Sequence, residues 1–353
     1  MARLRTSVSV KDVAALAGVS VGTVSNVLNA PQLVSGQTRE RVETAIEKLG
    51  WVRNESARQL RAGRSRSIGL VVMDLSNPFF TDVALGVEDT VASRGYIVQV
   101  GNSAESSGRE QTQLDLFEQQ RVRGLLFAPI AEVGDRVVQL RRRGIPVVVV
   151  DRPGELAETC SVSVDDVEGG RLAGQHLLSL GHRRLAVVGG PSHLHQVHDR
   201  RLGVDLATSA VAGADVVVIS TPRLDVDSGV RAAGELAALP DGERPTAAFA
   251  INDLVAIGLL QGFVTQGLRV PQDIAIIGYD DIAFAAAAAV PLSSIRQPRR
   301  ALGQRAAELL FAEIDAIESD ATAEHEHEHV TFTPSLVVRR STAPGTTRVW
   351  STG

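Results

Sequence analysis

A series of short apolar runs, recurring from Ile68 onward, constrains the fold of this chain more than any other feature. Segments that fit helices of about a dozen residues separate the runs. Strands of a parallel sheet are buried on both faces, so they read as continuous Val, Ile and Leu. We therefore predict an α/β body of two doubly wound lobes with parallel sheets. The runs are Ile68–Met73, Tyr96–Val100, Gly124–Ala128, Val147–Val150, Leu185–Val188, Val216–Ile219, Ala247–Ile251 and Ile274–Ile277.

The first fifty residues have helical periodicity instead. Ser9 and Asp12 are spaced as a capping box, and Gly18 ends the helix that follows them. Ser20 caps a second helix, predicted over about Val21–Asn29. Two short helices that meet across a three-residue turn have the form of a helix-turn-helix, an all-α unit that presents its second helix to the major groove of DNA.

A third helix is predicted to open at Ser35 and to end at Gly50. The charge distribution favours a nucleic acid as the partner of this helical head. Residues 1–67 hold eleven Lys and Arg against five Asp and Glu, a net +6, whereas the whole chain carries −5. A small basic head on an acidic body indicates that only the head meets a polyanion. An ordinary helical hairpin with a solvated basic surface is the alternative.

Composition excludes several classes of protein. With one cysteine among 353 residues, Cys160, the chain has no internal disulfide framework. No apolar run approaches the roughly 18 residues of a membrane span, and Lys11 and Asp12 interrupt any export signal. Phosphate-loop, nucleophile-elbow and HExxH motifs are absent from the sequence. We expect a cytoplasmic protein that is not an enzyme, with no cofactor, no catalytic residues and no membrane partner.

Ten short motifs, in order and at similar spacing, resemble those of the lactose-repressor (LacI/GalR) family of regulators over roughly residues 8–342. They are Lys11–Ala14, Thr23–Asn29, Val34–Ser35, Thr38–Arg39, Ala57–Leu60, Ser76–Phe80, Arg201–Gly203, Asn252–Asp253, Gly278–Asp281 and Arg296–Pro298. The resemblance implies a DNA-binding transcription regulator, most often a repressor, that acts as a homodimer on a pseudo-palindromic operator. It also implies a body like that of type I periplasmic sugar-binding proteins, with three crossovers between the lobes.

Domain boundaries follow from that resemblance. The head spans residues 1–50, a basic hinge or linker 51–66, the effector-binding and dimerisation body 67–342, and a tail 343–353. Within the body, the first lobe is predicted at about 67–160 and 295–322, and the second at about 161–292 and 325–342.

The resemblance also indicates how the head meets DNA. Val21, Gly22 and Asn26 face base edges, while hydroxyls at helix ends contact phosphates. Asn26 stands where many relatives have Arg, and Asn favours adenine, so we expect an operator that differs from a generic family site. Leu60 is expected to wedge into a minor-groove step, although it is alternatively an anchor onto the body. The predicted DNA-binding residues are Ser9, Ser20, Val21, Gly22, Thr23, Asn26, Asn29, Thr38, Ala57, Arg58 and Leu60.

In the body, polar residues come just after apolar runs. Ligands of parallel sheets bind outside the carboxyl ends of the strands, so these residues are expected to converge on a cleft between the lobes. Asp74 and Asp253 are equally explained as helix caps. A mixed set of donors and acceptors suits the hydroxyls of a sugar or sugar derivative. The predicted effector-binding residues, which the resemblance supports, are Phe79, Phe80, Asp151, Arg201, Asn252 and Asp280.

Histidines alternate with glutamates near the C-terminus, at His325, His327 and His329. At strand spacing the three imidazoles share one face, which could bind zinc or nickel. An exposed edge or loop is the preferred interpretation, so no metal site is predicted.

The sequence therefore predicts a dimeric, operator-binding regulator controlled by a small molecule. Two rival functions are a sugar-binding protein that does not bind DNA and a sugar-metabolising enzyme. An effector that releases DNA and one that promotes DNA binding are both compatible with the sequence.

Overall fold

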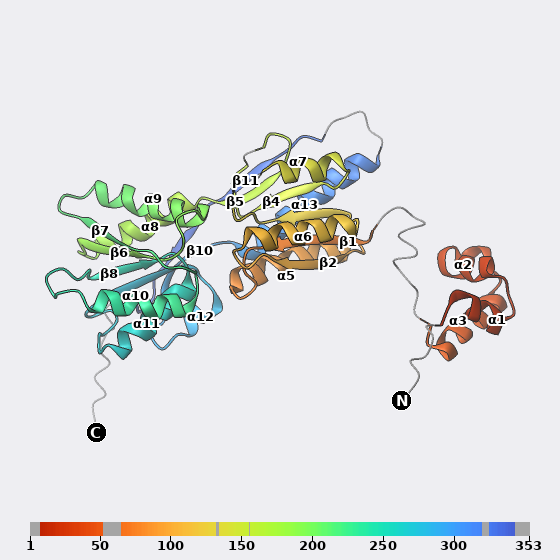
Figure 1. The fold of residues 1–353 in the computed structure, drawn as a ribbon, viewed down its shortest axis with the longest axis horizontal. Helices are drawn as coiled ribbons and strands as arrows, with labels where there is room; N and C mark the ends of the chain where they lie inside the picture. The colour runs from red at the N-terminus through yellow and green to blue at the C-terminus, as the bar shows by residue number, and fades with distance from the viewer. Residues whose placement is uncertain (1–7, 52–64, 132–133, 155, 320–324, 343–353) are drawn as a thin grey trace, which may run out of the picture. The chain divides into compact units, whose positions relative to one another are not determined.

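The computed structural model describes residues 8–51, 65–131, 134–154, 156–319 and 325–342 (Figure 1). The chain divides into two compact units at Arg64 and Ser65, here called the head and the body. Among the described residues, no helix is long and apolar enough to cross a membrane.

Over residues 8–51 the head is a bundle of three α-helices and one 3-10 turn. The predicted caps are confirmed: Ser9 and Asp12 form a capping box, and the Ser20 and Ser35 hydroxyls accept hydrogen bonds from the backbone N–H groups of Thr23 and Thr38. Small apolar side chains, such as the fully buried Val13, Val24 and Val42, form its core. The elements are α1 (Val10–Ala17), α2 (Val21–Asn29), η1 (Pro31–Leu33) and α3 (Gly36–Leu49).

The turn between α1 and α2 is held by α3. Gly18 has φ +61°, a left-handed conformation that glycine adopts at little cost. The guanidinium of Arg41, on α3, donates to the carbonyl oxygens of Ala17 and Gly18 on the other side of this turn. The angle at which α1 presents α2 is therefore set within the head.

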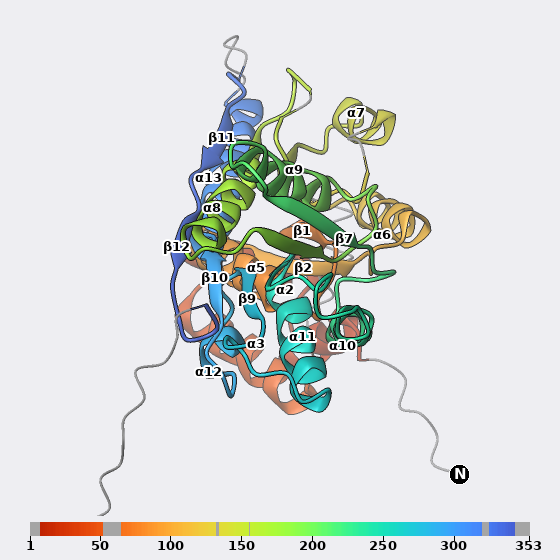
Figure 2. The same cartoon turned by 90° about the vertical axis from the view of Figure 1, so that its left-hand side faces the viewer.

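The body contains two six-stranded sheets (Figures 1 and 2). All eight predicted apolar runs are strands in it, and the pairings are parallel except that β12 runs antiparallel to β10. The first sheet has the order β11-β5-β4-β3-β1-β2, with β1 (Ser67–Val72), β2 (Ile97–Asn102), β3 (Gly124–Phe127), β4 (Val147–Val150), β5 (Ser161–Val164) and β11 (His329–Phe332). The second has the order β12-β10-β9-β8-β6-β7, with β6 (Arg184–Val188), β7 (Asp215–Ile219), β8 (Ala247–Ala250), β9 (Ala275–Asp280), β10 (Ser293–Arg296) and β12 (Ser335–Val337).

Helices cover both faces of each sheet, as parallel sheets require. On the first sheet, α5 (Pro78–Ser93) and α13 (Arg299–Glu318) pack together on one face, while α6 (Ser107–Gln119) and α7 (Asp135–Arg142) cover the other. On the second, α8 (Asp166–Ser179) pairs with α9 (His195–Ser209), and α10 (Val226–Ala237) with α11 (Asp253–Thr265) on the opposite face. The short α12 (Ala283–Ala287) contacts β10.

The described chain passes between the sheets three times, after β5, after β10 and after β11. This differs from the lobe boundaries drawn from the sequence, which assigned 161–292 and 325–342 to the second lobe. The structure places β5 and β11 in the first sheet, where Val149 of β4 pairs with Ser161. It also places β10 wholly in the second sheet, although 295–322 was assigned to the first lobe. β5 and β10 are short and rich in serine, and β11 is the four-residue segment His-Val-Thr-Phe, so no apolar run marks these strands.

Candidate functional site

The head exposes the predicted DNA-facing surface of α2. Val24 and Val27 are buried in the head core, which leaves Val21, Gly22 and Asn26 on the outer face. The Asn26 amide is then available to hydrogen-bond a base edge, and the backbone can approach a base closely at Gly22, which has no side chain.

Three helix N-termini carry the predicted phosphate contacts. The predicted residues here are exposed except for Thr23 and Thr38, which are half-buried. Thr23 and Thr38 are engaged with the capping hydroxyls Ser20 and Ser35, and Asn29 donates from its side chain to the Ser25 carbonyl oxygen. The N–H groups of exposed helix N-termini are suitable sites for phosphate oxygens, and the hydroxyls beside them already form hydrogen bonds within the head. Ala57, Arg58 and Leu60 lie outside the described residues.

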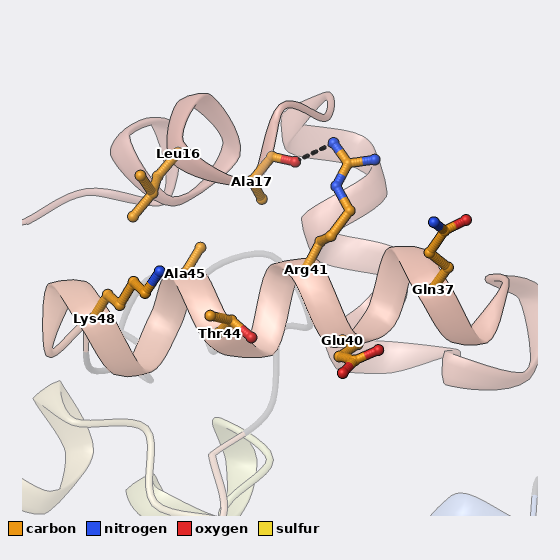
Figure 3. A pocket seen from close by; sticks show the side chains of 8 residues that line it. All are labelled: Leu16, Ala17, Gln37, Glu40, Arg41, Thr44, Ala45 and Lys48. Carbon is orange, nitrogen blue, oxygen red and sulfur yellow. Dashed lines mark hydrogen bonds between the residues drawn. The ribbon is translucent and has the colours of Figure 1, made fainter.

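A shallow pocket lies between α1 and α3, on surfaces that do not include α2 (Figure 3). The side chain of Arg41 reaches over its upper edge toward Ala17, so the turn contact described above forms part of the pocket's rim. Its lining residues are Leu16, Ala17, Gln37, Glu40, Arg41, Thr44, Ala45 and Lys48.

In the body, charged residues gather at the carboxyl ends of strands around Arg200. The Arg200 side chain is buried; its Nε donates to Asp166 Oδ1 at 2.9 Å and its Nη1 to the Ile251 carbonyl oxygen at 2.9 Å. The same Nη1 lies 3.7 Å from Asp280 Oδ1, and the guanidinium stacks on the ring of Tyr279 at 3.8 Å. We call Asp151, Asp166, Asp280 and Arg200 the carboxylate cluster.

The arginine of this cluster is not the predicted one. Arg201 is exposed and pairs with Asp205 on the surface of α9, with 3.4 Å between Nε and Oδ2. Successive residues of a helix point about 100° apart, so only one of the two neighbours faces the strand ends. The structure therefore corrects the placement: Arg200 occupies the position expected for Arg201.

Two hydrogen bonds to side-chain carboxylates of the cluster join the sheets. Gln196, on α9, donates from Nε2 to Asp151 Oδ2 at 3.0 Å, and Asp151 follows β4 of the first sheet. Asn77, before α5, donates from Nδ2 to Asp280 Oδ2 at 3.2 Å, and Asp280 ends β9 of the second sheet. Gln297 donates to the other oxygen of Asp280 at 2.7 Å. Each predicted carboxylate is thus shared between the two halves of the body.

The electrostatics of the cluster are strained. Burial raises the pKa of Asp151 to about 7, with a further contribution from the neighbouring Asp166 carboxylate, against the opposing effect of Arg200. Burial also raises the pKa of Asp280, again opposed by Arg200. Both residues have left-handed backbones, with φ +60° for Asp151 and +103° for Asp280. Strain of this kind concentrates at functional sites.

The other predicted effector residues are supporting parts of the structure. Asn252 caps α11 by accepting from Val255 N, and donates to the Leu224 carbonyl oxygen at 3.1 Å. Phe79 and Phe80 are buried in the first lobe, edge to face with centroids 4.9 Å apart.

Asp74 and Asp253, for which helix capping was the alternative, cap no helix. Asp74 accepts from the backbone and hydroxyl of Ser76, whereas the fully buried Asp253 accepts from Ile282 N and Ser294 Oγ. Asn77 and Asn252 are the caps of the helices that follow.

Sequence reasoning missed Asp166, Gln196 and Arg200. Asp166 follows a strand that has no apolar run, and Gln196 begins a helix rather than ending a strand. A search for polar residues in the first turn after β5 would have found Asp166, whereas nothing local marks Gln196.

Comparison with known proteins gives two family matches. Residues 9–54 match "Bacterial regulatory proteins, lacI family", and residues 175–342 match "Periplasmic binding protein-like domain". Among curated proteins, the chain is 32% identical over 339 residues to the HTH-type transcriptional repressor PurR of Photobacterium profundum, covering 94% of this chain and 98% of that protein.

Solved structures agree with these matches. A complex of the transcriptional regulator CelR with cellobiose is 32% identical, with a TM-score of 0.69, and the match covers 95% of this chain and 99% of that one. The Lac repressor dimer bound to operator and the anti-inducer ONPF is 26% identical, with a TM-score of 0.77 and coverages of 96% and 99%. A regulator from Enterococcus faecium with bound ribose is 31% identical, with a TM-score of 0.70 and coverages of 79% and 99%.

Proposed function

The chain belongs to the lacI family of bacterial regulatory proteins, and on that premise we propose that it represses transcription by binding an operator through α2, under the control of a small molecule held at the carboxylate cluster. Its relatives are transcriptional repressors, which are not enzymes. Repressors of this family bind operator DNA and small-molecule effectors.

The observation that carries the effector proposal is the burial of three carboxylates around one arginine. The desolvation penalty of buried charges exceeds their mutual attraction unless the geometry is excellent. Such a cluster is therefore poorly explained by folding stability alone. Asp151, Asp280 and Arg200 converge from different elements, and together they supply acceptors and donors. A polyhydroxylated ligand needs both at each buried hydroxyl, which favours a sugar or sugar derivative.

Control follows from the two hydrogen bonds that join the sheets. A ligand hydroxyl that donates to Asp151 replaces Gln196, and one that donates to Asp280 replaces Asn77. The effector therefore has different contacts with open and closed arrangements of the lobes, which is the requirement for shifting a conformational equilibrium. Asn252 fixes the strand end that carries the Ile251 carbonyl, while Phe79 and Phe80 form the apolar support behind Asn77.

For DNA recognition, Val21, Gly22 and Asn26 face the base edges, and the hydroxyls at the N-termini of the head helices position the head on phosphates. A homodimer presents two heads to the two halves of a pseudo-palindromic operator. Ala57, Arg58 and Leu60 belong to the hinge segment 51–66 and are assigned to the minor groove by resemblance.

The test is fluorescence anisotropy with DNA upstream of the gene and of its neighbours, with and without sugars, sugar phosphates and nucleosides. One compound that changes operator affinity in the wild type, but not in Arg200→Lys, supports the proposal. Arg201→Lys is the matched control and should respond as the wild type does. Sugar binding without any operator binding would favour a sugar-binding protein, and turnover of a sugar would favour an enzyme.

A further inference from the structure

Three potential metal ligands meet at one edge of the first sheet, away from the carboxylate cluster. Cys160 precedes β5, and His325 and His327 precede β11, which is paired with β5. The Cys160 Sγ lies 3.2 Å from His325 Nε2 and 3.5 Å from His327 Nδ1, and all three ligand atoms fall within 4.8 Å of one another. Residues 165 positions apart in the sequence thus present one thiol and two imidazoles to one point.

We propose that Cys160, His325 and His327 bind a zinc ion. In a tetrahedral zinc site, Zn–S and Zn–N bonds of about 2.3 and 2.0–2.1 Å separate sulfur from nitrogen by roughly 3.6 Å. The observed separations of 3.2 and 3.5 Å are close to this value before any ion is bound. A mixed thiolate and imidazole set selects zinc over hard cations such as magnesium and calcium.

A second observation points to a cation at the same place. Glu313, on α13, is buried, and its Oε2 is a buried polar atom without a hydrogen-bond partner in the described structure. Its Oε1 accepts from Arg141 Nη1 at 2.6 Å. Glu313 is close enough to Cys160 and His325 to interact electrostatically with both. An unsatisfied buried carboxylate oxygen near two of the proposed ligands is costly alone, and a dication compensates it.

Binding has a defined proton balance. The ligand form of cysteine is the thiolate, so the Cys160 proton leaves to solvent when the Zn–S bond forms. Arg141 Nη2 lies 3.2 Å from His327 Nε2, and arginine is only a donor, so Nε2 accepts and the imidazole proton is on Nδ1. Zinc at Nδ1 moves this proton to Nε2, which ends the contact with Arg141 and leaves that arginine with Glu313.

The structure also separates His329 from the other two histidines. Its Nδ1 lies 2.9 Å from Ser161 Oγ, and its side chain is exposed. The expectation of three imidazoles on one face is therefore wrong, because strand geometry begins only at His329. This difference supplies a matched control, since His329 shares the Glu-His repeat but not the proposed site.

The test uses the full-length protein without a histidine tag, stripped with a chelator and kept reduced with a phosphine. Cobalt is titrated in and then displaced by zinc. Cys160 is the sole cysteine of the chain, so a thiolate-to-cobalt charge-transfer band assigns the ligand without a cysteine variant. We expect one cobalt per chain, a band that zinc abolishes, and a zinc affinity measured by competition with a chromophoric chelator.

Single substitutions distinguish zinc binding at this site from weak zinc binding by the Glu-His repeat as a whole. Loss of a residue that only hydrogen-bonds a metal ligand typically lowers metal affinity by about 10–100-fold. His325→Gln and His327→Gln each remove a ligand, so they should lower zinc affinity by more than this and should remove the cobalt band. His329→Gln should keep both. Absence of the band in the wild type, its persistence in both ligand variants, or equal loss in all three variants would each overturn the proposal.

Discussion

Gln196 donates a 3.0 Å hydrogen bond to Asp151, and this bond links a helix packed on the second sheet to the end of β4 in the first. Both side chains are buried, and Gln196 Nε2 also lies 3.4 Å from the sulfur of Met73. Together with the bond from Asn77 to Asp280, this contact joins the two halves of the body through a carboxyl group whose pKa is raised to about 7.

Asp151→Asn should remove one component of the pH dependence of stability. The folded pKa of Asp151 is raised to about 7, so between about pH 4 and 7 the unfolded chain has lost a proton that the folded chain retains. Folding stability contributed by this group is complete at low pH and is lost as pH rises. As pH rises through this window, the free energy of unfolding of the wild type should fall relative to that of the variant by up to about 1.4 kcal/mol per pH unit.

Urea unfolding followed by far-ultraviolet circular dichroism, from pH 5 to 8, measures this difference. Asp241→Asn is the control, because Asp241 has a side chain that is 95% exposed. Parallel curves for the wild type and Asp151→Asn would contradict the assignment.

Arg200→Lys should impair the response to effector, whereas Arg201→Lys should not. Arg200 makes directed hydrogen bonds to Asp166 and the Ile251 carbonyl that a lysine ammonium does not reproduce. Hydrogen bonds to charged groups contribute about 1.5–3 kcal/mol, so the effector concentration for half-maximal response should rise about 10-fold or more. Operator anisotropy during effector titration gives this value. Equal effects of the two variants would argue against Arg200 as the ligand contact.

Gly203→Ala should destabilise the body, because α8 and α9 approach too closely to admit a methyl group. A Cβ at Gly203 would lie 2.0 Å from the Val167 carbonyl oxygen. We expect a loss of about 1–3 kcal/mol, the usual cost of overpacking, together with a weaker effector response as Arg200 moves from Asp166. Gly234→Ala on α10 meets nothing within 4 Å and should be neutral or stabilising. Thermal unfolding compares the two, and a neutral Gly203→Ala would be inconsistent with this packing.

Asn26→Arg should change the operator preference at one base pair in each half-site. Asparagine pairs with the N6 and N7 edge of adenine, and arginine with the O6 and N7 edge of guanine, each with about 1–3 kcal/mol of discrimination. Affinities for operators varied at that base pair, measured at one salt concentration, provide the test. A wild type that prefers guanine would refute the role given to Asn26.

Arg41→Met should destabilise the head by about 1–3 kcal/mol, since two carbonyl acceptors of the turn lose their donor. Lys48→Met, at another position lining the pocket of Figure 3, is the matched control and should have little effect. Thermal unfolding of the full chain, with operator affinity in parallel, measures both. Equal stabilities would show that the Arg41 contact does not hold the turn.

Local signals in the sequence predicted most of the fold. Capping residues such as Ser9, Ser20 and Ser35 marked the head helices because a cap acts within one turn. Apolar runs marked eight strands because the inner strands are buried on both faces, whereas the edge strands β2 and β7 are partly exposed but still rich in valine and isoleucine. Ser161–Val164 escaped because it alternates serine and valine, and its pairing with β4 and β11 is fixed by distant segments.

The candidate site was predicted only in part, for a geometric reason. Asp151 and Asp280 follow strands, so their convergence follows from the parallel sheets. The choice between Arg200 and Arg201 depends on the rotation of α9 against α8, which is set by the close approach at Gly170 and Gly203. The meeting of Cys160 with His325 and His327 depends on strand pairing across more than 160 residues, which no local pattern contains.

The contact of Arg41 with the turn between α1 and α2 has a consequence for kinetics. The helix to which we assign DNA reading, α2, follows a turn that is held by hydrogen bonds within the head, so α2 is already positioned when it meets a duplex. Encounters with the vast excess of non-operator DNA then require no folding step in the head. Hopping and sliding are then limited by diffusion and counterion release rather than by folding of the head.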